Sequence, residues 1–171
     1  MQIKSKTYIM HLENLPLDIG YASEKVTLRN MDITECILGG HNGKTQLIIT
    51  TPLIDDAFLE ELKIIDKILP KDGNYEVTAS LVVANNTHKS PSLDNFDFYI
   101  DDKDELADFY GLRLKGEPYN DELTKAIILI SKDGAIFYDD FVLNIDDKFN
   151  IDTLYRKIAA AQVCYTGKGC H

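Results

Sequence analysis

A strand that leads directly into an amphipathic helix, in residues 45–69, most constrains how this chain can fold. The strand, Thr45–Thr51, is apolar and β-branched, and Pro52 and an acidic turn follow it. Apolar residues then recur every three or four positions on one helix face, at Phe58, Leu62, Ile65 and Leu69. This succession predicts an α/β fold, in which the end of such a strand is a common place for chemistry.

Three later segments support the same fold class. Residues 77–84 form a continuous apolar run that is typical of a buried parallel strand. Residues 126–131 and 135–142 flank Lys132-Asp133-Gly134, which indicates a β-hairpin, and residues 151–162 have helical periodicity. Weaker patterns predict strands in 1–20, 26–31, 33–38 and 96–100, a helix in 101–110 and a loop in 111–121.

The order of these elements, βαβ, then a helix, a β-hairpin and a last helix, is the layout of a thioredoxin-like domain. We therefore expect a central mixed sheet flanked by helices in residues 1–162, with residues 1–22 as an N-terminal β extension. Residues 163–171 differ in character and form a cysteine-containing tail.

Charge and composition exclude several classes of partner. The chain has 171 residues and a formal net charge of −10, so its surface repels nucleic-acid backbones and anionic lipid. No apolar run approaches the length of a membrane span, and the N-terminus lacks the apolar region of a secretory signal. We therefore expect a cytoplasmic location, and the three cysteines are too few for a disulfide framework.

Few residues outside the tail suggest a site. Asp55 and Asp56 precede the apolar face of a helix, which favours helix capping over a paired-acid or metal site. Cys36 lies in a predicted strand and reads as a small buried apolar residue. The histidines have no ligand spacing with one another and are expected to be surface or structural residues: His11, His41, His88 and His171.

The chain resembles the thiol peroxidase branch of the peroxiredoxins over residues 16–160. The resemblance is carried, in order, by VTLRNMDITECILGGHNGKTQLIITTPLID, DELADFYGL and LTKAIILISKDGAIFYDDFV. It implies a thioredoxin-like fold, thiol-dependent peroxide reduction without a bound cofactor, a thiol reductant as partner, and a homodimer.

The reactive residues of that family are changed in this chain. The family motif is proline, three residues, threonine, two residues and the peroxide-reducing cysteine, and it matches Pro52, Asp56 and Leu59. The supporting arginine of the family matches Lys125, and residues 88–95 lack the resolving cysteine. Leucine cannot form a sulfenate, and a carboxylate at position 56 opposes thiolate formation. We expect Leu59 in the first turns of the helix after Pro52.

These changes leave two interpretations. In the first, the protein is a non-catalytic redoxin that binds or regulates a partner in redox homeostasis. In the alternative, it is a thiol-dependent oxidoreductase or peroxidase that uses the only cysteine pair, Cys164 and Cys170. The tail itself is either inert, or redox-active, or a metal site in which His171 joins the two thiolates.

Overall fold

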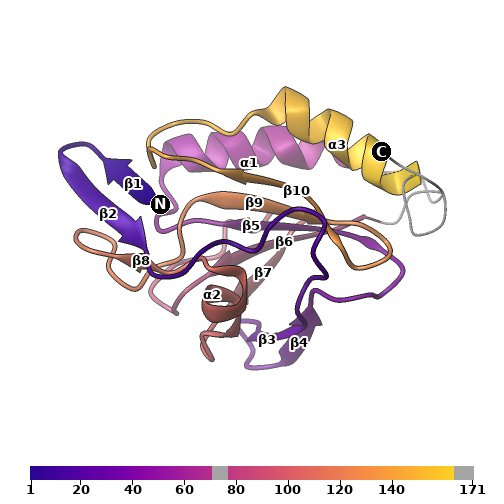
Figure 1. The fold of residues 1–171 in the computed structure, drawn as a ribbon, viewed down its shortest axis with the longest axis horizontal. Helices are drawn as coiled ribbons and strands as arrows, with labels where there is room; N and C mark the ends of the chain where they lie inside the picture. Colours follow the sequence, from indigo (N-terminus) through magenta and orange to yellow (C-terminus); the bar gives the residue numbers. More distant parts are fainter. Residues whose placement is uncertain (71–76, 164–171) are drawn as a thin grey trace.

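The computed structural model describes residues 1–70 and 77–163, in which a large mixed sheet and a small antiparallel sheet form the framework (Figure 1). The large sheet has the order β10-β9-β5-β6-β7-β3-β4, and the small one has the order β1-β2-β8. The strands of the large sheet are β3 (Val26–Arg29), β4 (Glu35–Leu38), β5 (Thr45–Thr50), β6 (Val77–Val83), β7 (Asp97–Ile100), β9 (Ala126–Ile130) and β10 (Ile136–Phe141). The strands of the small sheet are β1 (Gln2–Ser5), β2 (Tyr8–Leu12) and β8 (Leu114–Lys115).

The central strand β5 organises the large sheet. It pairs in parallel with β6 and antiparallel with β9, and every one of its residues is buried. Helices α1 (Asp56–Ile68) and α3 (Ile151–Val163) cover one face, and α2 (Glu105–Tyr110) lies against the other (Figure 1). The sequence therefore predicted the fold class correctly, a mixed sheet flanked by helices.

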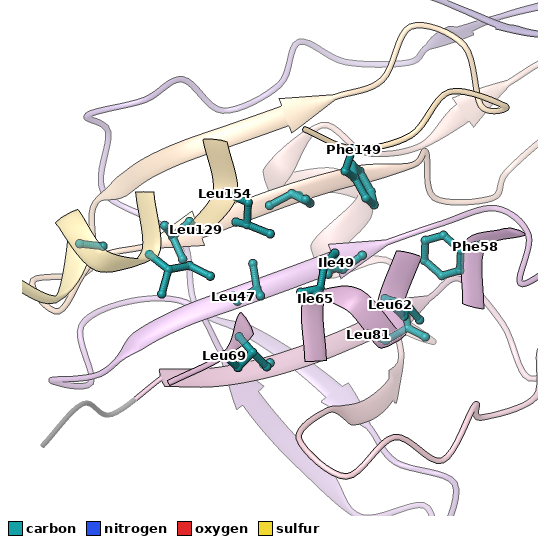
Figure 2. Close-up of a cluster of buried hydrophobic side chains, with 14 of the residues drawn as sticks. Leu47, Ile49, Phe58, Leu62, Ile65, Leu69, Leu81, Leu129, Phe149 and Leu154 are labelled. Atoms are coloured by element: carbon teal, nitrogen blue, oxygen red, sulfur yellow. The ribbon is translucent and has the colours of Figure 1, made fainter. Parts of the chain in front are cut away.

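Alternating side chains of β5 enter two separate cores. Leu47 and Ile49 pack beneath α1 and α3, whereas Ile48 belongs to the core on the α2 side. Figure 2 shows the first core, with Phe58 and Phe149 at one end and Leu69 at the other. Burial on both faces explains why the central strands are apolar without alternation.

Several element boundaries differ from the sequence prediction. Residues 111–121 are not only loop, because Leu114–Lys115 forms β8 and pairs with His11 and Leu12 of β2. The strands predicted at 26–31 and 33–38 are shorter, since Met31 and Ile33 lie in the connecting turn and are exposed. Ile33 has a φ of 64°, which takes it out of the extended conformation.

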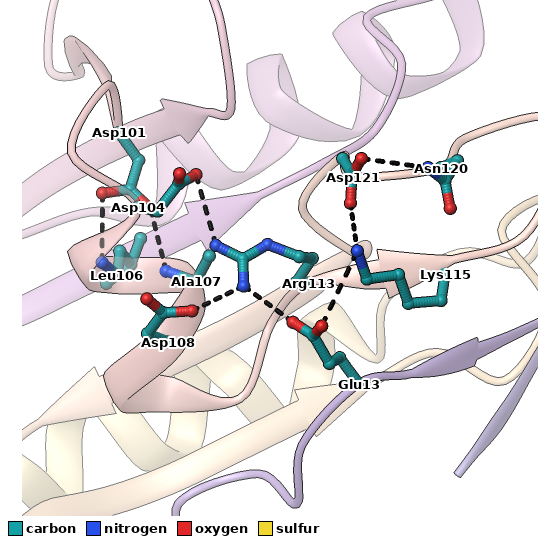
Figure 3. A network of polar contacts seen from close by, with 10 residues as sticks. All are labelled: Glu13, Asp101, Asp104, Leu106, Ala107, Asp108, Arg113, Lys115, Asn120 and Asp121. Carbon is teal, nitrogen blue, oxygen red and sulfur yellow. Dashed lines mark hydrogen bonds and ion pairs between the residues drawn. The ribbon is translucent and has the colours of Figure 1, made fainter.

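The helix predicted at 101–110 begins only at Glu105, after the N-cap residue Asp104, which has a φ of 57°. The Asp101 carboxylate accepts hydrogen bonds from the backbone N–H groups of Leu106 and Ala107, at 3.0 and 2.8 Å (Figure 3). Burial raises the pKa of Asp101 to about 6, although the two N–H donors act in the opposite direction.

An ion-pair network joins the N-terminal segment to α2 and β8. Arg113 contacts Glu13, Asp104 and Asp108, with the contact to Glu13 at 2.7 Å (Figure 3). Lys115 adds contacts to Glu13 and Asp121. The three partners hold the pKa of Arg113 above its ordinary value, even though burial lowers it. Glu13 thus connects the end of β2 to a chain segment about 100 residues later.

Candidate functional site

The junction between β5 and α1 is held by short local hydrogen bonds. Thr51 Oγ1 donates to the backbone carbonyl of Leu53 at 2.7 Å, and Pro52 is buried. Asp55 is the N-cap residue of α1, and its Oδ1 accepts from Phe58 N at 2.8 Å. The capping predicted for this acidic pair is confirmed for Asp55, while Asp56 is the exposed first residue of the helix.

Leu59 lies in the first turns of α1, where the sequence analysis predicts it. The side chain is half-buried and lines an open pocket of about 400 Å³. Three other apolar residues, Leu53, Ile54 and Pro91, also line this pocket. The polar residues around it come from the segment after β6: Thr87, His88, Lys89 and Ser90.

Lys125 does not point to an open catalytic position but into a buried ion pair. Its Nζ lies 2.7 Å from Oε2 of Glu61, and each of the two side chains is only 5% exposed. The same Nζ donates to the backbone carbonyl of Asp147 at 2.5 Å, and Glu61 Oε1 accepts from Phe149 N at 2.7 Å. The pair therefore joins α1, the start of β9 and the segment before α3.

Two aromatic rings complete the surroundings of this cation. The Nζ of Lys125 lies 4.9 Å from the ring centre of Phe149 and 5.8 Å from that of Phe58. A small cavity of about 90 Å³ adjoins Lys125, and among the residues lining the two pockets only Leu53 is common to both. Leu59 and Lys125 thus line different pockets.

The sequence analysis missed Glu61, although a sequence signal for it exists. Glu61 lies three residues after Phe58 and four before Ile65, so it interrupts the apolar face of α1. A carboxylate in such a position needs a buried partner, because an isolated buried charge is costly. Local periodicity does not indicate which cation that partner is.

A second polar group stands at the edge of the Leu59 pocket. His88 Nε2 lies 2.9 Å from Glu122 Oε2, and Asn85 Nδ2 donates to Glu122 Oε1 at 2.8 Å. Thr87 N donates to Asn85 Oδ1 at 3.1 Å. His88 accordingly has the structural role that the sequence analysis expected, and the polar edge of the pocket is held in place.

The cysteines lie away from this junction or outside the described residues. Cys36 is half-buried in β4 rather than fully buried, and its thiol contributes to raising the pKa of Tyr99 after the larger effect of burial. Cys164, Cys170 and His171 fall outside the described residues. Over residues 1–70 and 77–163, no group of three metal-ligating side chains lies close enough to hold an ion.

The direction of α3 determines how far the last described residue lies from Lys125. Phe149, next to Lys125, precedes the helix, which then runs for 13 residues. At the usual rise per residue this carries the chain about 20 Å along the sheet. The last described residue of α3, Val163, is therefore at the end of the helix remote from Lys125.

Comparison with solved structures identifies the fold. A peroxiredoxin-like protein from Aquifex aeolicus superposes with a TM-score of 0.82 at 23% identity, over 94% of this chain and 96% of that one. A thiol peroxidase from Chromobacterium violaceum gives 0.76 at 17% identity, over 92% and 95%. The chain has a peroxiredoxin fold. AhpC from Mycobacterium tuberculosis shares this fold more distantly, with a TM-score of 0.66 at 15% identity, over 91% and 97%.

The likeness lies in the structure. No protein-family model matches the sequence, and no curated protein matches it significantly. Almost the whole peroxiredoxin fold is present, because the two chains cover each other over more than nine tenths of their lengths. Among the described residues, no helix is long and apolar enough to cross a membrane.

Proposed function

We propose that this protein is a non-catalytic redoxin, a peroxiredoxin fold kept as a binding or regulatory protein of redox homeostasis. The observation that carries the proposal is the state of two positions, Leu59 and Lys125. Leu59 presents an apolar side chain where the family resemblance places the peroxide-reducing cysteine. Lys125, which matches the supporting arginine, is neutralised by Glu61.

Peroxide reduction needs a thiolate and a cation that stabilises developing negative charge. Leu59 supplies no thiolate, and the charge of Lys125 is already matched by a carboxylate at 2.7 Å. A lysine also lacks the two-pronged donor geometry of arginine. The junction between β5 and α1 therefore offers neither the thiolate nor the unpaired cation that peroxide reduction needs.

The alternative function, a thiol-dependent oxidoreductase that uses Cys164 and Cys170, rests on their being the only cysteine pair in the chain. The last described residue, Val163, lies at the end of α3 remote from Lys125, and Cys164 and Cys170 fall outside the described residues. A separate redox role of the tail is unaffected by this geometry.

Stopped-flow measurement of hydrogen peroxide consumption with a thioredoxin system tests the proposal. We expect no turnover above that of free cysteine in either the wild type or Cys164→Ser/Cys170→Ser. Turnover that survives the double substitution would contradict the loss of function at residues 52–59. Turnover that the substitution abolishes would assign the activity to the tail.

The proposal includes a cytoplasmic homodimer, in which residues 1–162 form the redoxin domain, with 1–22 as its extension and 163–171 as a tail. The family resemblance supports the dimer, and the paucity of cysteines supports the location. Sedimentation velocity at micromolar concentration tests the dimer, since a monomer there excludes a stable one.

A further inference from the structure

We propose that the pocket beside Leu59 binds a small apolar carboxylate, a ligand with one anionic group and a hydrocarbon body. The inference rests on the proposed function, because it gives the altered junction a ligand in place of a substrate. The pocket measures about 400 Å³, within the range of about 300–1,000 Å³ that is usual for small-molecule sites.

The inner surface of the pocket selects the hydrocarbon body. Its apolar lining comes from two chain segments, Leu53, Ile54 and Leu59 on one side and Pro91 on the other. Ile54, Leu59 and Pro91 are half-buried, and the Leu53 side chain is 39% exposed, so a ligand would remove further apolar surface from water. At position 59 a cysteine would offer less apolar surface than the leucine does.

The charge around the pocket selects the anion. Among the described residues that line the pocket, Lys89 carries the one fixed charge and none is a carboxylate, although the whole chain has a net charge of −10. Within the described part of the chain, Lys89 has no ion-pair or hydrogen-bond partner for its ammonium group. A carboxylate that enters the pocket supplies that partner.

The polar edge is preorganised for such a ligand. Glu122 holds His88 at 2.9 Å and Asn85 at 2.8 Å, so the segment that carries Lys89 is anchored before any ligand arrives. Glu122 is itself satisfied by these two contacts and does not line the pocket. Preorganisation lowers the ordering cost of binding.

Isothermal titration calorimetry of the full chain with decanoate, below its micelle concentration, tests this proposal. We expect saturable binding with one decanoate per chain, and at least tenfold weaker binding of decanol and of decyltrimethylammonium. Lys89→Gln should weaken decanoate binding at least fivefold and leave decanol unchanged. Lys67→Gln, at an exposed lysine on α1 that lines neither pocket described above, is the matched control and should bind decanoate as the wild type does.

Leu59→Glu supplies a second variant, because it places a carboxylate in the apolar lining and should abolish decanoate binding. The absence of decanoate binding, equal binding of decanol, or preferred binding of the cationic probe would overturn the proposal, as would an unchanged affinity in Lys89→Gln. The peroxide assay on the same samples separates the two claims, since turnover refutes the non-catalytic function and leaves the binding result standing.

Discussion

At the scale of single residues, Asp101 is a carboxylate that is only 1% exposed, and its pKa is raised from 3.8 to about 6 by burial. The folded protein therefore binds more protons than the unfolded chain between these two values. The contribution of Asp101 to the free energy of unfolding is therefore greatest below pH 4 and is lost as the pH rises through 6. The loss amounts to about 3 kcal/mol for a shift of about two pKa units.

Asp101→Asn should remove this dependence. We expect the free energy of unfolding of the variant to change less between pH 5.3 and pH 7 than that of the wild type, in urea titrations. Asp94→Asn, at an exposed aspartate, is the control and should behave as the wild type does. Titration of the Asp101 carboxyl carbon by NMR gives an independent value, and a pKa near 4 would contradict the expectation.

A thiol restored at position 59 tests whether the buried pair of Glu61 and Lys125 influences the chemistry at that position. In Leu59→Cys the cation of Lys125 remains paired at 2.7 Å, so we expect a thiol pKa at or above the ordinary value of about 8.5. Leu59→Cys/Glu61→Gln frees that charge and should lower the thiol pKa. The pH dependence of iodoacetamide alkylation measures both.

Leu59→Cys/Glu60→Gln serves as the control for this comparison, because Glu60 is exposed and pairs with Lys63. An equal thiol pKa in the Glu61 and Glu60 variants would show that the buried pair does not determine the chemistry at position 59.

At the scale of elements, the buried pair joins α1 to the start of β9. Lys125→Met removes one charge and leaves Glu61 unpaired, which should cost about 3–5 kcal/mol of unfolding free energy. Lys125→Met/Glu61→Gln leaves no buried charge and keeps an acceptor for Phe149 N, so it should be more stable than the single variant. Urea unfolding measures both, and a double variant less stable than Lys125→Met would contradict this account.

The start of α1 depends on one carboxylate rather than two. Asp55→Ala removes the acceptor for Phe58 N and should destabilise the protein by about 1–2 kcal/mol. Asp56→Ala removes only a charge near the positive end of the helix and should cost about 0.5 kcal/mol. Thermal unfolding measures the stability of the two variants. An equal loss of stability in both would contradict the role of the hydrogen bond from Phe58 N to Asp55.

Elements buried on both faces could be predicted from the sequence, and elements fixed by distant partners could not. The apolar runs in 45–51, 77–84 and 126–131 show their burial directly. β8, by contrast, has two residues and exists through its pairing with β2, about 100 residues earlier. The partner of Glu61 is likewise 64 positions away, so local periodicity could not identify it.

At the scale of the whole molecule, Arg113 attaches the N-terminal segment to α2. Its side chain is 14% exposed and contacts three carboxylates, so Arg113→Ala should loosen β1 and β2 more than β5. Hydrogen exchange followed by mass spectrometry should show faster exchange in residues 1–13 and unchanged exchange in 45–50. High salt should reproduce part of the effect in the wild type.

Arg29→Ala is the matched control, since Arg29 pairs with Asp102 in the segment before α2, and none of its described ion pairs or hydrogen bonds involves the N-terminal segment. Faster exchange in residues 1–13 of this control, or none in Arg113→Ala, would assign the attachment to other contacts.

The position of β5 between β9 and β6 also has a kinetic consequence. Gln46 pairs with Ile130, 84 residues later, and with Thr78, 32 residues later. The chain must therefore close two long loops before its central strand has both neighbours, and the entropy of closure is lost before either pairing repays it. In the nascent chain the edge of β5 that pairs with β9 therefore stays unpaired until residues 126–130 have been synthesised.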